Sequence, residues 1–293
     1  MNMRALGVLL LSASFAMAAH AQSGVGIEIE DIIDNRLSAG VLVGSLELRG
    51  KLKGTGLDKA VAARVLVKEA RDSKGNVLST DRLSDDFTPR EQNSGTLQFS
   101  VGSPARAASS VTLKGTVELY VPGRDPNATV RIDKALAKLD APLSHAKLKS
   151  AKLTLTPLSA AGHSAWMKKH KLDEAKIEQL RAEGKKRGVS DKEIEMAIEM
   201  AKAFDSMDTA LPEGTVILSG SAADFDRLYR VEVLGADGQV IDTGNRSTST
   251  RGDDAVMTLQ PSEAPPANAA LQFQLLTPKS TMSFPFELKV DLP

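Results

Sequence analysis

Two stretches of this chain resemble each other, and they decide the predicted fold. Residues 54–80 read GTGLDKAVAARVLVKEARDSKGNVLST, and residues 220–243 read GSAADFDRLYRVEVLGADGQVIDT. Val65 falls on Val231 at an offset of 166 residues, and both lie in short runs rich in β-branched residues. Such runs, bounded by turn residues, are typical of β-strands.

The offset between the two stretches shrinks in steps of three residues. It is 163 where Gly75 meets Gly238, and 160 where Leu113 meets Phe273. These losses fall between strands and keep the alternating apolar residues in phase, as loop deletions do. The pattern predicts an internal duplication, and two unrelated sandwiches of similar composition are the alternative.

Short strands separated by turns are predicted on both sides of this repeat. Residues 72–75 (DSKG) and 235–238 (GADG) each end on a glycine that can adopt a positive φ, so each predicts a β-hairpin. Further predicted strands occupy residues 111–121, 129–132, 152–156 and 284–292. Strands of this length without βα alternation favour two immunoglobulin-like antiparallel β-sandwich modules.

The first residues have the features of a secretory signal. Arg4 precedes an apolar run over residues 7–17, and Ala19-His20-Ala21 offers a cleavage site. We therefore expect residues 1–21 to be a signal peptide and the protein to be periplasmic or secreted. The remaining predicted division is module 1 over residues 22–160, a helical segment over 161–209, and module 2 over 210–293.

The segment between the modules predicts two helices. Asp173 is a candidate N-cap for the first helix, which should end near Gly184 or Gly188. Ser190 and Glu193 have the spacing of a capping box for the second helix. The class predicted for the whole chain is therefore mainly β, with a two-helix insert joining the sandwiches.

The second helix carries a methionine stripe beside its isoleucines. Met196, Met200 and Met207 follow helical spacing, and methionine often forms adaptable binding surfaces. A stripe of this kind is expected to pack as core against a sheet. The alternative is a partner-binding surface, and these three residues are the candidate site for a protein partner.

One set of residues on the same segment has the chemistry of a metal site. His163, Met167 and His170 lie at positions i, i+4 and i+7, so a continuous helix would place them on one face. Imidazole and thioether groups suit copper, which is the candidate cofactor for this set. The three neighbouring lysines argue against a cation, and solvated histidines beside a packed methionine are the alternative.

Composition excludes several function classes. The chain has no cysteine, so disulfides and thiolate metal sites are absent. Without Arg4 it carries 36 basic and 37 acidic residues, a balance that gives no reason to expect nucleic acid. After the signal, no apolar run is long enough for a transmembrane helix.

No catalytic motif is complete in the sequence. Residues 162–166 (GHSAW) resemble the serine turn of α/β-hydrolases, but Trp166 replaces the final glycine and no histidine follows His170. The predicted function is a non-enzymatic interaction or structural protein of the cell envelope. The alternatives are a periplasmic copper or small-ligand binder and, third, a hydrolase without a recognisable motif.

Overall fold

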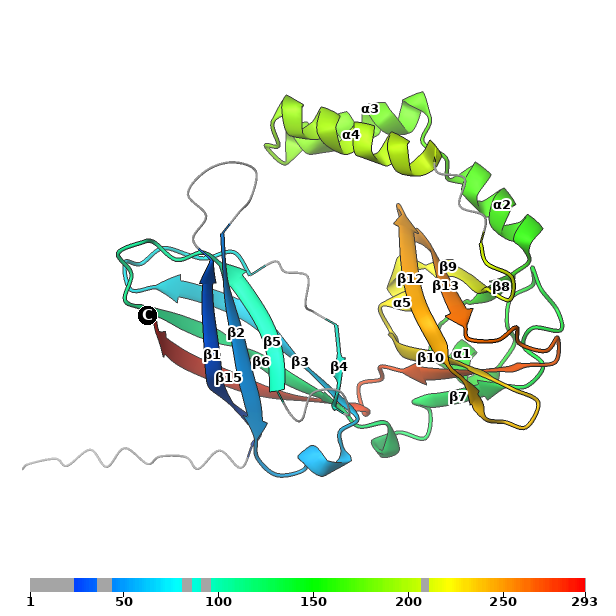
Figure 1. Ribbon diagram of the computed structural model, residues 1–293, viewed down its shortest axis with the longest axis horizontal. Helices are drawn as coiled ribbons and strands as arrows, with labels where there is room; N and C mark the ends of the chain where they lie inside the picture. The colour runs from blue at the N-terminus through cyan, green and yellow to red at the C-terminus, as the bar shows by residue number, and fades with distance from the viewer. Residues whose placement is uncertain (1–23, 36–43, 81–85, 91–95, 207–210, 293) are drawn as a thin grey trace, which may run out of the picture.

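The computed structural model describes residues 24–35, 44–80, 86–90, 96–206 and 211–292. Within these residues the protein is mainly β, with four antiparallel sheets and five α-helices (Figure 1). The predicted signal peptide and Met207 lie outside the described residues. The mainly β class with a helical insert is confirmed.

The first sandwich, which we call sandwich 1, packs a three-stranded sheet on a four-stranded one. The sheets have the orders β1-β2-β5 and β15-β6-β3-β4. Their strands are β1 (Gly26–Asn35), β2 (Ser45–Lys53), β3 (Ala62–Asp72), β4 (Thr88–Pro89), β5 (Thr96–Gly102), β6 (Ser110–Tyr120) and β15 (Thr281–Asp291). One apolar core fills the space between them.

Sandwich 2 packs two four-stranded sheets around a second core. The orders are β8-β9-β13-β12 and β7-β14-β10-β11. Their strands are β7 (Thr129–Ile132), β8 (Thr156–Leu158), β9 (Val216–Ser221), β10 (Leu228–Leu234), β11 (Val240–Ile241), β12 (Thr243–Arg251), β13 (Asp254–Pro261) and β14 (Ala270–Leu275). Two short helices, α1 (Ala146–Ser150) and α5 (Ala222–Phe225), lie on the connections.

Period-two alternation places the core side chains, as predicted for residues 111–121. On β6, Val111, Leu113 and Val117 are buried, whereas Thr112 and Lys114 are not. The two predicted hairpin turns are also present. Gly75 (φ 88°) and Gly238 (φ 80°) both adopt the left-handed conformation that the turns require.

The strands are not divided between the sandwiches as the sequence order predicts. β7 follows β6 in the chain but pairs with β14 of sandwich 2. β15 follows β14 but returns to pair with β6 of sandwich 1. β8 also pairs within sandwich 2, with β9.

The predicted boundaries at residues 160 and 210 therefore do not follow the sheets. Residues 129–158 complete sandwich 2, and residues 281–291 complete sandwich 1. Alternation shows that a strand has one apolar face, but it does not show which sheet edge the strand joins. The predicted edge strand around Pro285 does lie at a sheet edge, although in the other sandwich.

Two crossover segments carry these exchanged strands and lie side by side. Val121 donates its N–H to the carbonyl of Ser280 (2.7 Å), and Leu275 donates to the carbonyl of Ala128 (2.7 Å). Each bond joins one crossover to the other. The two sandwiches are therefore linked by a pair of hydrogen-bonded chain segments.

One predicted strand is displaced by several residues. Lys152, expected in a strand, has φ 53° and follows α1, and the strand begins only at Thr156. The backbone turns here because Leu148, Leu153 and Leu155 all point into the core of sandwich 2. That packing overrides the local β-propensity.

The residues that the predicted repeat aligns have different pairing partners in the two sandwiches. Val65 and Val231 lie on β3 and β10, and Leu113 and Phe273 lie on β6 and β14. Val231 pairs directly with Phe273, whereas Val65 pairs with Val117, four residues beyond Leu113. The strands that the predicted repeat aligns therefore pair in both sandwiches, but in a different register.

Candidate functional site

A helical arm is inserted between two neighbouring strands of sandwich 2. Residues 159–215 connect β8 to β9, although Leu158 and Ile217 are already paired partners. The arm contains α2 (Ala160–Lys169), α3 (Glu174–Lys186) and α4 (Asp191–Ser206). Antiparallel neighbours need only a short turn, so sandwich 2 does not require an insertion of this length.

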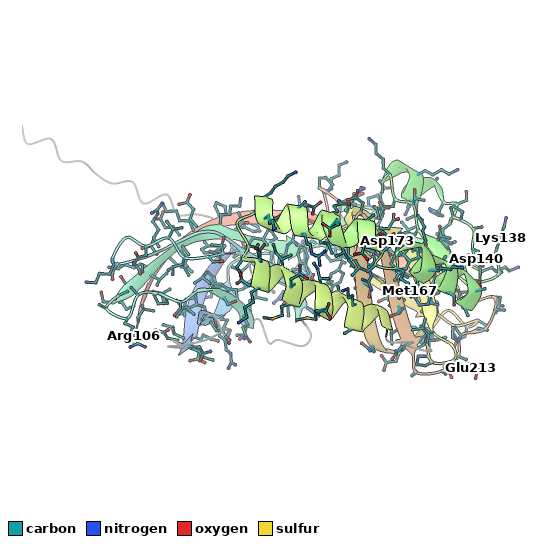
Figure 2. The ribbon with its side chains drawn as sticks, turned by 90° about the horizontal axis from the view of Figure 1, so that it is seen from above. Arg106, Lys138, Asp140, Met167, Asp173 and Glu213 are labelled. Atoms are coloured by element: carbon teal, nitrogen blue, oxygen red, sulfur yellow. The ribbon has the colours of Figure 1, made fainter. Side chains whose placement is uncertain are left out.

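Helices α3 and α4 form a hairpin that stands apart from both sandwiches in Figure 1. Figure 2, which looks down on the arm, shows the two helices side by side, with Asp173 at the base of α3. Asp173 accepts a hydrogen bond from the N–H of Lys176, as predicted for an N-cap. Ser190 and Glu193 make the predicted capping box of α4.

The hairpin has a small core of its own. Ile177, Ile194 and Ile198 are buried between the helices. Gly184 lies within α3, and a Cβ atom there would come within 2.7 Å of the Ile194 side chain. Gly188 (φ 75°) is the glycine that ends the helix. The close approach at Gly184 lets the two helices pack with few apolar residues.

Charged groups reinforce the contact between α3 and α4. Arg181 donates to both carboxylate oxygens of Glu195 (2.6 and 3.0 Å) and to Glu178 (2.5 Å). This pairing holds the pKa of Glu195 below its usual range. The side chains are partly exposed, so we expect these ion pairs to orient the helices more than to stabilise them.

The candidate methionines are on the surface. The side chains of Met196 and Met200 are 45% and 55% exposed, because the isoleucine face of α4 is the one that packs on α3. The expectation that this stripe packs as core is not met at these two positions. A pair of exposed methionines one helical turn apart is an adaptable apolar surface.

The candidate metal residues lie on or next to α2. His163 and Met167 are within the helix and partly buried, and burial lowers the pKa of His163. His170 is the C-cap, and its ring stacks on Trp166 with centroids 4.2 Å apart. α2 is a separate helix before the one that Asp173 caps, so the arm has three helices where two were predicted, and the three candidates lie along α2 and at its C-cap.

Both ring nitrogens of His170 face acceptors. Nδ1 lies 2.8 Å from the carbonyl oxygen of Trp166, and Nε2 lies 2.8 Å from a carboxylate oxygen of Asp254. These two contacts hold the imidazole ring at both of its nitrogens. The bond from His170, aided by Lys169, holds the pKa of Asp254 below its usual range. A metal at His170 would have to displace one of these bonds.

No cluster of three His, Asp or Glu side chains suited to a metal occurs among the residues that the structure describes. That finding does not bear on His163, Met167 and His170, because it concerns sets of three His, Asp or Glu and one of these three residues is a methionine. Whether copper binds there stays a prediction. In the structure, the hydrogen bond of His170 connects the end of α2 to Asp254 at the start of β13.

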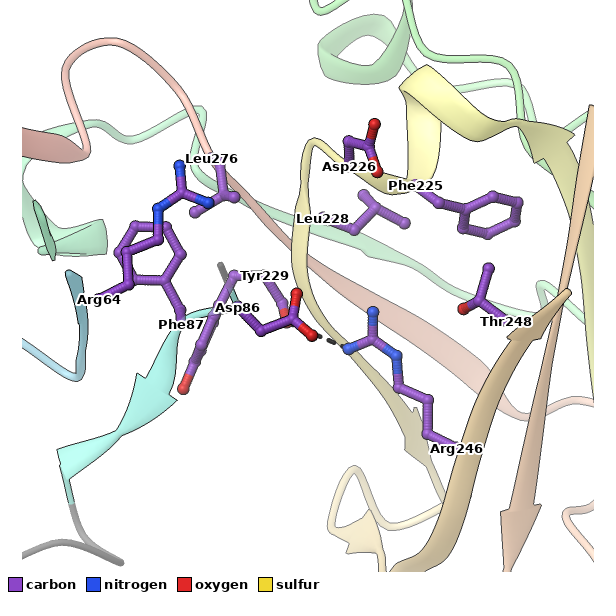
Figure 3. A pocket seen from close by; sticks show the side chains of 10 residues that line it. All are labelled: Arg64, Asp86, Phe87, Phe225, Asp226, Leu228, Tyr229, Arg246, Thr248 and Leu276. Atoms are coloured by element: carbon purple, nitrogen blue, oxygen red, sulfur yellow. Dashed lines mark hydrogen bonds between the residues drawn. The ribbon is translucent and has the colours of Figure 1, made fainter. Parts of the chain in front are cut away.

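A pocket of about 520 Å³ lies where the two sandwiches meet (Figure 3). From sandwich 1, Arg64 projects into it with Nε and Nη2 both 2.8 Å from a carboxylate oxygen of Glu118. The guanidinium also lies 4.4 Å from the ring centre of Phe87. An ion pair and a cation–π contact therefore help to hold Arg64 in place.

Arg246 of β12 enters the same pocket from sandwich 2. It donates to the carbonyl of Tyr229 (3.2 Å) and faces the carboxylate of Asp86 (Figure 3). Burial lowers the pKa of Arg246, and the charge of Asp86 opposes that shift. Each guanidinium in the pocket thus faces a carboxylate, and an anionic ligand would have to compete with these groups.

Three aromatic rings line this joint. Tyr120 and Tyr229 stack with centroids 4.7 Å apart, and Phe87 meets both edge-on at 6.2 Å. Tyr120 is fully buried, and its hydroxyl has no hydrogen-bond partner among the described residues. Burial raises the pKa of Tyr120 above its usual range. The rings join sandwich 1 to sandwich 2.

Sequence reasoning missed the joint between the sandwiches. Its members are spread along the chain and belong to no motif with a fixed spacing. The chain has two tyrosines, and the structure brings both to this joint, but the sequence around them does not indicate the contact.

Comparisons of the chain with models of protein families, with curated proteins and with solved structures found no match. None of the described helices is both long and apolar enough to span a membrane.

Proposed function

We propose that this chain is an exported, non-enzymatic interaction protein of the cell envelope, in which the two sandwiches hold the helical arm out towards a protein partner. The observation that carries the proposal is the exposure of Met196 and Met200 on the arm. An apolar pair on an inserted, outward-standing helix has no evident structural task and fits helix-mediated recognition.

The placement of the arm supports recognition over a structural role. α3 and α4 have their main contacts with each other, and their core is separate from those of the sandwiches. Long insertions between paired strands are commonly functional. The ten basic and ten acidic residues over 163–208 balance, so the apolar stripe is the feature that a partner would recognise.

The export part of the proposal rests on residues 1–21. Their charged start, apolar run and A-x-A site have the features of a secretory signal, and they support a mature protein in the periplasm or outside the cell. N-terminal sequencing of the protein after expression in its host tests this. A mature start at Gln22 is the expected result, and a retained Met1 contradicts export by this signal.

We also propose that the sandwiches are immunoglobulin-like and arose by duplication. The order β15-β6-β3 matches β7-β14-β10 strand by strand, and β1-β2-β5 matches β8-β9-β13. Val65 and Val231 pair at different positions along the neighbouring strand, which implies that the register of this strand pair shifted after duplication. Superposition of the two sandwiches in a crystal structure tests this, and strand paths that do not coincide would contradict it.

A capture experiment tests the role of the arm. The mature protein, a Met196→Gln/Met200→Gln variant and a Lys192→Gln control on the same helix are each used to capture proteins from the cell envelope. We expect a partner held by the first and third proteins and bound about tenfold more weakly by the methionine variant, about 1.4 kcal/mol. Circular dichroism establishes that all three are folded.

Equal capture by all three folded proteins would contradict a role for the stripe. A methionine variant that fails to fold would show that the stripe stabilises the arm, and the recognition role would then be lost as well. Because the two methionines are exposed, glutamine should be tolerated at both positions.

A periplasmic copper or small-ligand binder is the second candidate. The pocket between the sandwiches, lined by Arg246 and Tyr229, favours a small polar ligand, and His163 and Met167 favour copper. Titration of the mature protein with Cu(I) and Cu(II) is compared with a His163→Ala/His170→Ala variant. Equal uptake by the two proteins removes the copper hypothesis. A hydrolase is the third candidate, and turnover in a broad substrate screen would support it.

A further inference from the structure

The turn between α3 and α4 divides the chain into two halves that both contribute to each sandwich. The residues before Gly188 contain β1 to β8, and those after it contain β9 to β15. The first half thus holds sandwich 1 without β15. The second half holds sandwich 2 without β7 and β8.

Strand pairing between the halves is extensive. β15 pairs with β6 along its whole length, from Thr281 opposite Tyr120 to Asp291 opposite Ser110. β7 pairs with β14, and β8 pairs with β9. Each half therefore has a sheet edge that is filled by a strand of the other half.

The same strands close both apolar cores. Val290 is buried in sandwich 1, and Phe286 packs against that core. At Gly115, opposite Phe286, a Cβ atom would come within 2.9 Å of the Phe286 ring, so the glycine leaves room for the ring. In the other direction, the first half supplies Val130, Ala135, Leu148, Leu153 and Leu155 to the buried core of sandwich 2.

Polar contacts between the halves are well formed where the crossovers meet. Thr277 donates to a carboxylate oxygen of Asp125 (2.6 Å), and Ser280, which is fully buried, accepts the N–H of Val121. Arg227 donates to the carbonyl of Ala151. These bonds add specificity to the apolar contact, because a half without its partner would leave these groups unpaired.

We infer that the two halves interlock, so that a chain cut at the α3–α4 turn stays assembled. The partner that fits the open sheet edges of each half is the complementary half. Covalent continuity through the arm is then unnecessary for the fold. This inference rests on the strand exchange and is independent of the function proposed for the arm.

The test is a full-length mature chain with the recognition sequence of a site-specific protease inserted between Gly188 and Val189. These residues are in an exposed turn. After complete cleavage, size-exclusion chromatography in native buffer should show both fragments in one peak at the volume of the uncut chain. The same sample in denaturant should show two peaks, which establishes that the cut is complete.

A second cleavable variant separates the interlock from simple pairing of α3 with α4. Ile194→Asp and Ile198→Asp together remove the apolar contact between these helices. The cut fragments of this variant should still elute together. Separation of the fragments in native buffer, in either protein, overturns the inference, since independent sandwiches joined by a linker would come apart.

Discussion

At the scale of single residues, Asp72 holds the first hairpin turn. Its carboxylate accepts hydrogen bonds from the N–H groups of Lys74, Asn76 and Ala105 and from the side chain of Asn76. These bonds, led by the side chain of Asn76, lower the pKa of Asp72 to about 2. Because the folded pKa is below the unfolded value, the bonds stabilise the fold above about pH 4, and this is lost as the pH falls towards 2.

We therefore predict that Asp72→Asn lowers the melting temperature at neutral pH. The difference from the unmodified protein should shrink as the pH falls from about 5 to about 2, where Asp72 itself becomes protonated. Thermal unfolding followed by circular dichroism across this range measures it. Asp237→Asn is the matched control, because Asp237 in the second turn accepts one backbone hydrogen bond, from Gln239. A difference for Asp72→Asn that is constant with pH would contradict the prediction.

Gly115 on β6 is a second residue whose identity is set by packing. A Cβ atom there would lie 2.1 Å from the carbonyl oxygen of Leu66, so the two atoms would clash. Gly115→Ala should reduce the free energy of unfolding by roughly 1–3 kcal/mol, because β15 or β3 must move. Chemical denaturation measures the change. Gly244→Ala in β12, where nothing lies within 4 Å of the added atom, should change stability by less than about 0.5 kcal/mol.

At the scale of elements, the arm is an insertion that the sheets do not need. Leu158 and Ile217 are paired across the base of the arm, so a short glycine-containing turn can replace residues 160–214. We predict that this deletion leaves the melting temperature of the sandwiches within a few degrees, because all the buried residues of their two cores stay in place.

Calorimetry of the deleted and full-length proteins checks this prediction. The deletion removes the hydrogen bond between His170 and Asp254, which lies at the rim of sandwich 2. A His170→Ala variant of the full-length protein is the control for that bond. Aggregation or unfolding of the deleted protein, with the His170→Ala variant still stable, would show that the arm supports the sheets.

At the scale of the whole molecule, exchange of strands couples the two sandwiches. Loss of either core removes a strand that the other needs, so we predict a single cooperative unfolding transition. Leu155→Ala in sandwich 2, at a fully buried position, should cost about 2–5 kcal/mol. The Leu155→Ala substitution should also speed the hydrogen exchange of the slowest amides in sandwich 1, because the two sandwiches unfold together. Two separate calorimetric transitions, or an effect confined to sandwich 2, would contradict this coupling.

Local features of the fold could be predicted from the sequence to a large extent. Gly75 and Gly238, Asp173 and the Ser190–Glu193 box all perform the roles expected of them. The alternation on β6 is the observed burial pattern. These features depend on interactions within a few residues, which the sequence specifies directly.

The candidate sites were less accessible to sequence reasoning. Helical spacing placed Met196 and Met200 on one stripe, but only the packing of α4 on α3 shows that this stripe is exposed. His170 was a candidate metal ligand in the sequence, whereas its hydrogen-bond partner Asp254 lies 84 residues away. The joint around Arg64, Tyr120 and Tyr229 combines distant segments and had no local signature.

Most of the strands, the two hairpin turns and the helical character of the arm follow from the sequence, because hydrophobic periodicity and turn residues act over short distances. Tertiary structure alone decided which edges the strands join. β7 and β15 each have an apolar face that suits either sandwich, and hydrogen-bonding edges of β-strands are alike in every sheet. Contacts between distant segments, such as the backbone hydrogen bond from Val121 to Ser280 and the Phe286 ring against Gly115, favour the exchanged pairing.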